Sequence, residues 1–569
     1  MLMLYSCTGN AQDTEQNTSE ITVPESSEAP ESVLLLASEG KSDYKIVFPV
    51  SGGDYISAAE SLKSRLSNSF GINIPTSADY VLPGKNPQEK EILIGPCDRE
   101  ESRTVNSELK NGEYAVKVVG SKLVICGNGT EALNNALMLF CRNLSLTDNK
   151  ITVSSKDDIV FKRTFPVESF TIGGRPLSDY KIVVPKGSGT ARLFAKLIAA
   201  RIATRTGIEL EITDENHVPD SCEIRFGNFA ELPELEKNTF KVFVTGNVMT
   251  AYSSDIGGLF DAYFHLFDVI FGAKEKTISI PDGYVFSDKS TQESYEKAAD
   301  GNIRVLYHNV LGYGTDTPIY SRADIAYDIY CELDPDIICF EEAGSLFRSG
   351  ASSFYSNLKK NNLAEICFSS EGGLGNPIYY RNDRFELLDS GYGKSRNGDK
   401  GTTYAVFKRK SDGKIFAVTN SHFAANSNAQ NNPELGNKYR TQDAETAVSI
   451  LEKIKAKYPG ITVIMGGDYN SAKNSDPINV IDKSGAVHVR TQLSLWSNVP
   501  SPHHSYPVIN KNISDYDMYS GSLSGGSSSI DHIYFYGTDL KPVSYTVVTS
   551  IVALTTSDHT IHFADFSAG

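Results

Sequence analysis

The segment at residues 463–471, VIMGGDYNS, joins an apolar run to two glycines, an acid, an aromatic residue and an amide. An apolar run that ends at glycines predicts a buried β-strand that stops at a tight turn. Asp468 and Asn470 then lie on the rim of a sheet, where an acid can take part in chemistry. Because Asp and Asn are also common turn formers, this segment indicates an active site only if other segments match it.

The chain has 569 residues, enough for about three or four domains. Its 54 basic and 70 acidic residues give a net charge of −16. This balance argues against a surface that coats nucleic acid, because such a surface needs clustered Lys and Arg. An enzyme with an anionic substrate can still carry this charge if a metal ion neutralises its site. The eight cysteines include no CxxC pair, so neither a zinc cage nor a dense disulfide framework is indicated.

Residues 1–31 predict a signal remnant followed by a disordered tether. MLMLYSC, at residues 1–7, resembles the end of a bacterial lipoprotein signal, in which the cysteine is lipidated after cleavage. Tyr5 departs from the small residue usual there, and the basic and apolar parts of a signal are missing, which leaves the true start of the chain open. Residues 8–31 are polar and acidic, as in a flexible tether. We therefore expect an extracytoplasmic protein, lipid-anchored to the bacterial cell surface through Cys7.

From residue 32 onward one pattern occurs twice: a strand, a helix that ends at a glycine, a strand, a strand–turn–strand pair and an amphipathic helix. The first strands of the two copies are KSDYKIVFP at residues 41–49 and LSDYKIVVP at residues 177–185. Their next matching strands are EILIGPC at residues 91–97 and EIRFGNF at residues 223–229. This order predicts two tandem small α/β domains with helices on one face of each sheet.

We place these repeat units at residues 32–165 and 166–290. They resemble the non-catalytic N-terminal domains found beside bacterial glycosidases, which implies a binding or spacer role with carbohydrate as the ligand. Neither unit offers a reaction centre. Glu91 and Glu223 begin strands, and we expect them at solvated strand edges.

Residues 286–300 lose the apolar pattern, as an exposed linker does, and a third domain at residues 300–569 follows. Its first strand ends at Asn309. A later buried strand ends at the adjacent acids Glu341 and Glu342. Because alternate residues of a strand face opposite sides, we expect one of these two acids to be functional and the other to be solvated.

The third domain resembles the endonuclease/exonuclease/phosphatase superfamily, because six of its motifs occur in that family's order. They are Asn309, the acid after the DII run, TNSHF at residues 419–423, GGDYN at residues 466–470, IDHIY at residues 530–534 and SDH at residues 557–559. The resemblance implies a four-layer α/β/β/α sandwich, an α+β arrangement with the active site at one end. The superfamily includes deoxyribonucleases, neutral sphingomyelinases and inositol polyphosphate 5-phosphatases.

The resemblance also implies a metal site. Glu342 corresponds to the metal-binding acid, Asn309 helps to hold the metal or the phosphate, and Asp558 is a further acid beside the metal. Such oxygen ligands suit Mg²⁺, with Mn²⁺ or Ca²⁺ as alternatives. Glu341 stands where the family often has Gln, and this extra acid either tightens metal binding or faces solvent.

Five residues match the family's catalytic set, and the resemblance gives each a role. Asp468 and Asn470 match its Asp–Asn pair, His422 and His559 match its two histidines, and Asp531 orients His559. The family leaves open whether Asp468 or a histidine takes the proton of the attacking water. A phosphodiester repels hydroxide, so attack needs a cation, a base and donors for the transition-state charge, which this residue set supplies.

These features together predict a Mg²⁺-dependent phosphoric ester hydrolase, most simply a phosphodiesterase or nuclease. The loops at residues 424–440 and 496–526 are expected to border the site, and neither is strongly basic, which weakens duplex DNA as the substrate. RNA, sphingomyelin and inositol phosphates remain alternatives. From another class, the alternative is a catalytically silent surface adhesin or carbohydrate-binding protein.

Overall fold

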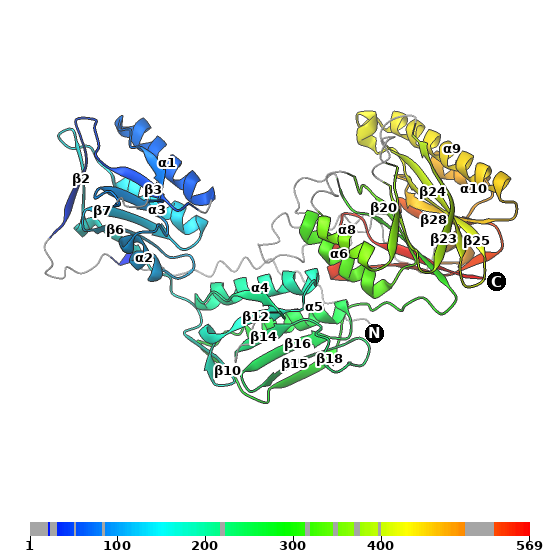
Figure 1. Ribbon diagram of the computed structural model, residues 1–569, viewed down its shortest axis with the longest axis horizontal. Coiled ribbons are helices and arrows are strands. Elements are labelled where there is room, and N and C mark those ends of the chain that lie inside the picture. Colours follow the sequence, from blue (N-terminus) through cyan, green and yellow to red (C-terminus); the bar gives the residue numbers. More distant parts are fainter. Residues whose placement is uncertain are drawn as a thin grey trace. The chain divides into compact units, whose positions relative to one another are not determined.

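The computed structural model describes residues 21–22, 31–50, 53–81, 86–216, 222–312, 319–344, 351–368, 376–395, 400–495 and 529–568 (Figure 1). It forms two compact units, of which the second contains Thr171–Ala199, Glu211–Ala273 and Ser279–Gly569. Cys7, most of the tether and the loop at residues 496–526 lie outside the described residues, so the expectations for them stay predictions. Every helix that the structure describes is too short or too polar to cross a bilayer.

The first repeat unit is built on a sheet with the order β1-β9-β6-β7-β5-β3-β4. Its strands are β1 Ile21–Thr22, β3 Lys45–Phe48, β4 Thr76–Ala78, β5 Glu91–Ile94, β6 Tyr114–Val119, β7 Lys122–Gly127 and β9 Ile159–Phe161. A separate two-stranded antiparallel sheet consists of β2 Val33–Ser38 and β8 Lys150–Ser154. Helices α1 Gly53–Phe70 and α3 Thr130–Asn143 pack on one face of the sheet, whereas α2 Glu100–Ser107 packs on the other. The prediction of helices on one face alone is therefore wrong for this unit.

The second repeat unit has the same strand order around its centre, β13-β12-β14-β16-β15-β18. Its strands are β12 Lys181–Val184, β13 Ile212–Asp214, β14 Glu223–Phe226, β15 Thr239–Thr245, β16 Val248–Ser253 and β18 Val285–Lys289. Its helices are α4 Gly189–Thr206 and α5 Ile256–Phe264, and α5 continues as a π-helix over His265–Ile270. In each unit four neighbouring strands run parallel, and a fifth strand pairs antiparallel with the last of them. The repeat in the sequence is therefore a repeat of topology.

The acids that begin β5 and β14 are not at solvated edges, which corrects that expectation. Glu91 and Glu223 are 2% and 6% exposed. Each of these strands pairs with a parallel neighbour on both sides, so it is a central strand of its sheet and not an edge strand. Glu91 is held there by Arg99, whose Nε and Nη2 donate to its two carboxyl oxygens over 2.9 and 3.0 Å.

The C-terminal domain contains two facing six-stranded sheets. The first has the order β21-β22-β20-β19-β30-β29 and the second β23-β24-β25-β26-β28-β27. The strands of the first are β19 Ile303–Asn309, β20 Ile337–Glu341, β21 Leu363–Ile366, β22 Ile378–Arg381, β29 Leu540–Val547 and β30 His562–Ala568. Those of the second are β23 Phe385–Lys394, β24 Gly401–Arg409, β25 Ile415–His422, β26 Thr462–Asp468, β27 Val487–His488 and β28 Asp531–Tyr536.

Helices cover the outer faces of these sheets, which gives the predicted four layers (Figure 1). They are α6 Ile319–Leu333 and α8 Ser352–Lys360 beside the first sheet, and α9 Pro433–Lys457 and α10 Asp476–Lys483 beside the second. Buried side chains from both sheets form one apolar core between them, and α9 and α10 share a second core with the outer face of their sheet. The α/β sandwich inferred from the sequence is confirmed.

The two glycines that end β26 let it approach its neighbours closely. A Cβ on Gly467 would lie 2.0 Å from the carbonyl oxygen of Ser421 in β25, and its φ is +129°. A Cβ on Gly466 would lie 2.6 Å from the ring of Tyr307 in β19, on the facing sheet. Only residues without a Cβ fit at these two positions, so the glycine pair allows β26 to lie close to β25 and to β19. This close approach places Asp468 at the end of the sandwich.

Helix α6 also supports the second repeat unit, because two of its acids accept bonds from the N-terminal turns of α4 and α5. Asp328 Oδ2 accepts from the backbone N–H of Thr190 over 2.8 Å. Glu332 Oε2 accepts from the backbone N–H of Ile256 over 2.7 Å. Helix N-termini favour negative charge, yet burial raises the pKa of Asp328 to about 6 and that of Glu332 to about 7.

We predict that Glu332→Gln stabilises the protein at alkaline pH. The folded state holds a proton on Glu332 up to about pH 7 and the unfolded chain releases it near pH 4.5, so the ionisation of this carboxyl costs stability as pH rises. Glutamine keeps an acceptor for Ile256 and removes that cost. Thermal melting should show a higher Tm for the variant at pH 8 and little change at pH 4, with Glu452→Gln as the exposed control. A pH-independent difference would contradict this reasoning.

Candidate active site

Polar residues lie at one end of the facing sheets, where several strands stop side by side. In the first sheet, Asn309 pairs with Glu341 across the parallel strands β19 and β20. In the second, Asp468 pairs with His422 on one side and with Asp531 on the other. Strand register therefore aligns these five residues in two rows, one on each sheet.

The carboxylate of Asp468 joins the two rows. Asn309 Nδ2 donates to its Oδ2 over 3.1 Å, and the backbone N–H of Asn470 donates to its Oδ1 over 2.8 Å. The Nε2 atoms of His422 and His559 lie 3.3 and 3.8 Å from the same Oδ2. Asp468 is only 2% exposed, and burial raises its pKa while the charge of His559 opposes the shift.

His559 is held as a cation by two acids. Its Nδ1 lies 3.0 Å from Asp531 Oδ2 and 3.2 Å from Oδ1. Burial alone would lower the pKa of His559, but Asp531 and Asp468 outweigh burial and raise this pKa well above its ordinary value. The orienting partner predicted for His559 is thus in contact with it, and Nε2 faces Asp468 with a proton to donate.

The pKa of His422 is shifted in the opposite direction from that of His559, because burial and a neighbouring lysine both lower it. Lys400 Nζ lies 3.2 Å from His422 Nδ1 and also contacts Nε2. Burial and this ammonium group hold the pKa of His422 well below its ordinary value. The sequence reasoning missed Lys400, which directly precedes β24. Its neighbour Gly401 pairs with His422, a register that no local pattern reveals.

The side chain of Asn470 makes a local contact. Its Nδ2 donates to the carbonyl of Phe423 over 3.1 Å, and its φ is +48°. Asn470 therefore fastens the turn after β26 to the end of β25, while its backbone N–H serves Asp468. In this conformation the side-chain Nδ2 of Asn470 bonds to the backbone of the fold.

The two adjacent glutamates differ in their surroundings. Glu341 is fully buried, and neither of its carboxyl oxygens has a hydrogen-bond partner among the described residues. Burial raises its pKa well above the ordinary value, and the acids Asp531 and Asp468 add to the effect. It does not face solvent. Glu342 follows the strand with a φ of +60° and is half-buried.

Two of the three predicted metal ligands lie near the same arginine. Glu342 and Asp558 are electrostatic partners of Arg322, whose Nη1 donates to the carbonyls of Val310 and Thr556 over 3.0 and 2.8 Å. A second group consists of Asp468, Asp531 and His559, which offer ligand atoms within 4.8 Å of one another.

The residues present fit a hard divalent cation. A buried carboxyl without a partner is costly, and Glu341 is such a group next to Asp468. With Asn309, Glu341 would supply oxygen ligands of the kind that Mg²⁺ prefers. When bound, the cation would withdraw charge from a phosphate and lower the barrier to attack.

Residues 308–559 match the family model of the endonuclease/exonuclease/phosphatase family. The C-terminal part of the chain is an endonuclease/exonuclease/phosphatase domain. Phosphate-ester hydrolysis is the chemistry that this family implies. No curated protein sequence matches the chain significantly.

Three solved structures are similar to part of this chain. The human Nocturnin catalytic domain with bound sulfate has 16% identity and a TM-score of 0.38, covering 48% of this chain and 96% of that one. TDP2 of D. rerio, complexed with a single-strand DNA product, has 17% identity and a TM-score of 0.36, covering 47% and 100%. An endonuclease/exonuclease/phosphatase protein of Bacteroides vulgatus has 19% identity and a TM-score of 0.36, covering 47% and 99%. At these values the similarities say nothing about the substrate.

We predict that Lys400 of the endonuclease/exonuclease/phosphatase domain contributes positive charge to the site. Lys400→Met should lower turnover by roughly tenfold or more, because it removes a charged donor beside His422. Without the ammonium group the pKa of His422 rises, so the loss should be greatest at acidic pH. Lys453→Met is the matched control. Lys453 lies on the outer helix α9, and its Nζ donates to Oη of Tyr404 in β24. Equal pH profiles for the two variants would argue against this role.

Proposed function

We propose that this domain hydrolyses phosphodiesters with the help of a divalent cation, preferably Mg²⁺. The observation that carries the proposal is the shared contact of Asn309, His422 and His559 with the buried Asp468 carboxylate. A phosphodiester placed against this group would meet donors on both sheets. Such preorganised donors are what an anionic transition state requires.

The protonation states suggest how the residues divide the work. His559 is already cationic and has no free lone pair, so it serves as a donor to a phosphate oxygen or to the leaving group. Asp468, whose pKa is raised by burial, is then the group that accepts the proton of the attacking water. Asp531 keeps His559 charged and oriented, and the neutral His422 stands beside the accepting carboxylate.

The catalytic assignment predicts unequal losses of activity. Asp468→Asn and His559→Ala should each lower turnover by about 100-fold to 10,000-fold with folding retained. Asp531→Asn should cost less, and its combination with His559→Ala should be far from additive, because the two groups act as a unit. The measurements are hydrolysis of bis-p-nitrophenyl phosphate at saturating Mg²⁺ and thermal melting. Near-normal turnover in both Asp468→Asn and His559→Ala, each folded, would overturn the assignment.

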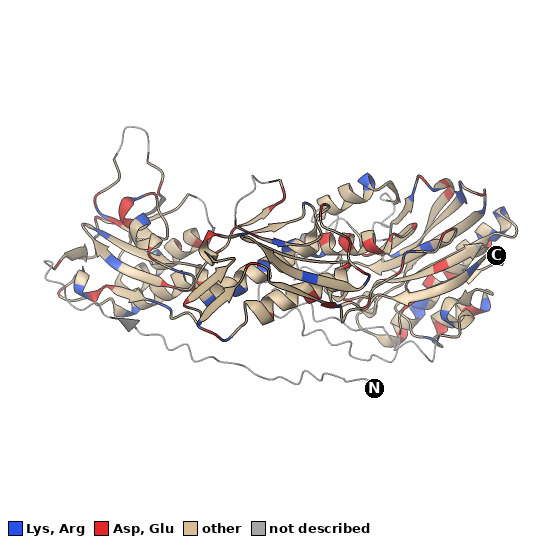
Figure 2. Cartoon of the chain, turned by 90° about the horizontal axis from the view of Figure 1, so that it is seen from below, with Lys and Arg blue, Asp and Glu red and all other residues tan. Residues whose placement is uncertain are grey.

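The substrate is proposed only as a class. In the view of Figure 2, Lys and Arg are interspersed with Asp and Glu along the described elements. This distribution, like the net charge of −16, disfavours long duplexes and leaves oligonucleotides, sphingomyelin headgroups and inositol phosphates. A screen of these substrates with and without Mg²⁺ decides among them. No turnover with any divalent cation would support the alternative of a silent surface adhesin.

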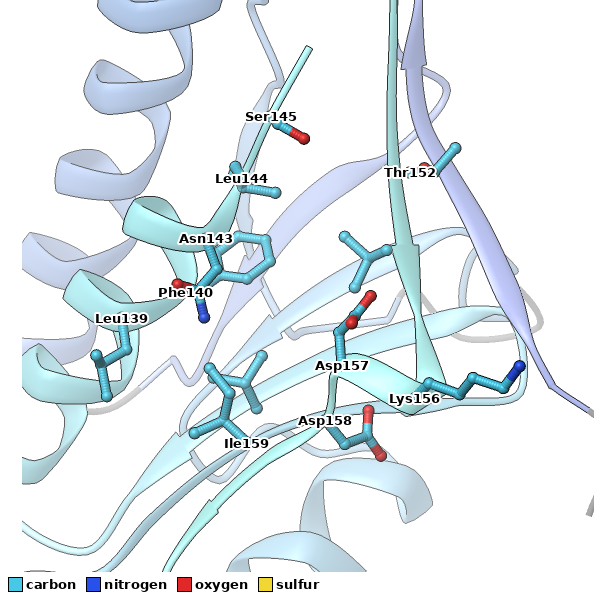
Figure 3. A pocket seen from close by; sticks show the side chains of 12 residues that line it. Leu139, Phe140, Asn143, Leu144, Ser145, Thr152, Lys156, Asp157, Asp158 and Ile159 are labelled. Atoms are coloured by element: carbon cyan, nitrogen blue, oxygen red, sulfur yellow. The ribbon is translucent and has the colours of Figure 1, made fainter. Parts of the chain in front are cut away.

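A second candidate activity is carbohydrate binding in the first repeat unit, supported by a cavity of about 570 Å³. Figure 3 shows apolar side chains such as Phe140 and Ile159 on one side of it and Asp157 and Asp158 on the other. Apolar surface can pack on the C–H face of a sugar while carboxylates accept from its hydroxyls. Calorimetry with an oligosaccharide panel tests this proposal, and equal heats for the wild type and Asp157→Ala would refute it.

We also propose extracytoplasmic, lipid-anchored localisation through Cys7. Fractionation of cells that express the chain with a complete signal tests this idea, because lipid chains would supply the membrane affinity. Equal membrane association of the wild type and Cys7→Ala would rule out the anchor.

A further inference from the structure

The short helix α12, Ile551–Leu554, leads directly into the SDH motif that carries His559. Its N-cap residue, Ser550, makes no side-chain capping bond. The first backbone N–H groups of a helix lack partners within the helix and must bond elsewhere when buried. Here those partners come from the segment before the catalytic domain, where the sequence predicted an exposed linker.

Residues 292–295, which we call the clamp, bind the start of α12. Tyr295 Oη accepts from the backbone N–H groups of Thr549 and Ser550 over 2.8 and 3.3 Å. Gln292 Oε1 accepts from the N–H of Ile551 over 3.3 Å. Glu293 Oε2 accepts from the hydroxyls of Tyr295 and Thr549 over 3.2 and 2.7 Å. The clamp therefore supplies the cap that Ser550 does not.

The other end of α12 is tied to the active site. The carbonyl of Thr556 accepts from Arg322 over 2.8 Å. The backbone N–H of His559 donates to Ser557 Oγ over 3.2 Å, and that hydroxyl also bonds the carbonyl of Asn309. A shift of α12 would thus move the backbone of His559 relative to Asn309.

The body of α12 is packed as well. Its residues Val552, Ala553 and Leu554 are buried, and the helix contacts α6 and α5. Helix α5 belongs to the second repeat unit, and a Cβ on its residue Gly257 would lie 2.8 Å from Gln292 Cβ. The clamp therefore lies between the first turn of α5 and the start of α12, within one compact unit.

We propose that the clamp positions His559, with Tyr295 as the main positioning residue, so that turnover depends on the segment that joins the second repeat unit to the catalytic domain. This inference rests on the proposed hydrolytic function. Tyr295 touches neither substrate nor reacting atoms. It acts by fixing α12, whose displacement by even about 1 Å would misplace the donor on His559.

The test uses Tyr295→Phe in the full chain, which removes only the hydroxyl. We expect kcat on bis-p-nitrophenyl phosphate to fall about tenfold with KM little changed, because orientation and not binding is lost. Hydrogen exchange of the amides at residues 549–551 should become faster. Tyr284→Phe is the matched control, since Tyr284 Oη also makes a side-chain bond, to His265 Nε2 over 2.9 Å, away from α12.

A double variant separates positioning from general loosening. In the Asp531→Asn background, where His559 has already lost its orienting acid, Tyr295→Phe should reduce kcat by much less than in the wild type. Gln292→Ala, which removes the acceptor for the N–H of Ile551, should act in the same direction and serves if Tyr295→Phe does not fold.

The outcomes are distinct. Unchanged kcat in Tyr295→Phe and Gln292→Ala, or a full additional loss in the Asp531→Asn background, would overturn the proposal. Equal losses in Tyr284→Phe would do so too. If the wild type itself hydrolyses no phosphate ester, the proposed function fails. The exchange measurement then still decides whether the clamp holds α12.

Discussion

Burial of the Asp468 carboxylate at the meeting point of two sheets is the constraint on which the rest of this domain depends. A carboxylate that is 2% exposed is tolerable only where partners surround it, and the protein supplies them from both sheets. Asn309 comes from the first sheet and His422 from the second, and His559 follows a short helix. The glycine pair before Asp468 permits this convergence, because a side chain at Gly467 would strike the backbone of β25.

Charge is distributed unevenly around that carboxylate. His559 is kept cationic by Asp531, whereas His422 is kept neutral by burial and by Lys400. The pKa values of two histidines with similar intrinsic basicity are therefore shifted in opposite directions. The buried Glu341 adds a further carboxyl that has no hydrogen-bond partner in the described part of the chain, and a bound cation would offset the cost of burying it.

The domain is also tied to the second repeat unit more closely than a flexible linker would allow. Acids on α6 accept bonds from the first turns of α4 and α5, and the clamp accepts bonds from the start of α12. The boundary predicted near residue 300 separates two sheets, but hydrogen bonds cross it. A fragment that starts after the clamp would lack the groups that cap α12.

The sequence by itself determined the type of fold, the repeat of topology and the polar residues at the strand ends, because hydrophobic periodicity and glycine turns are local signals. Asp468, Asp531 and His559 were assigned through the resemblance to the endonuclease/exonuclease/phosphatase superfamily, and they lie together. Tertiary structure alone decided that Glu341 faces these groups, that Lys400 meets His422 and that Tyr295 caps α12. Each of these facts depends on strand register or on contacts between residues up to 255 positions apart in the chain, which no local pattern encodes.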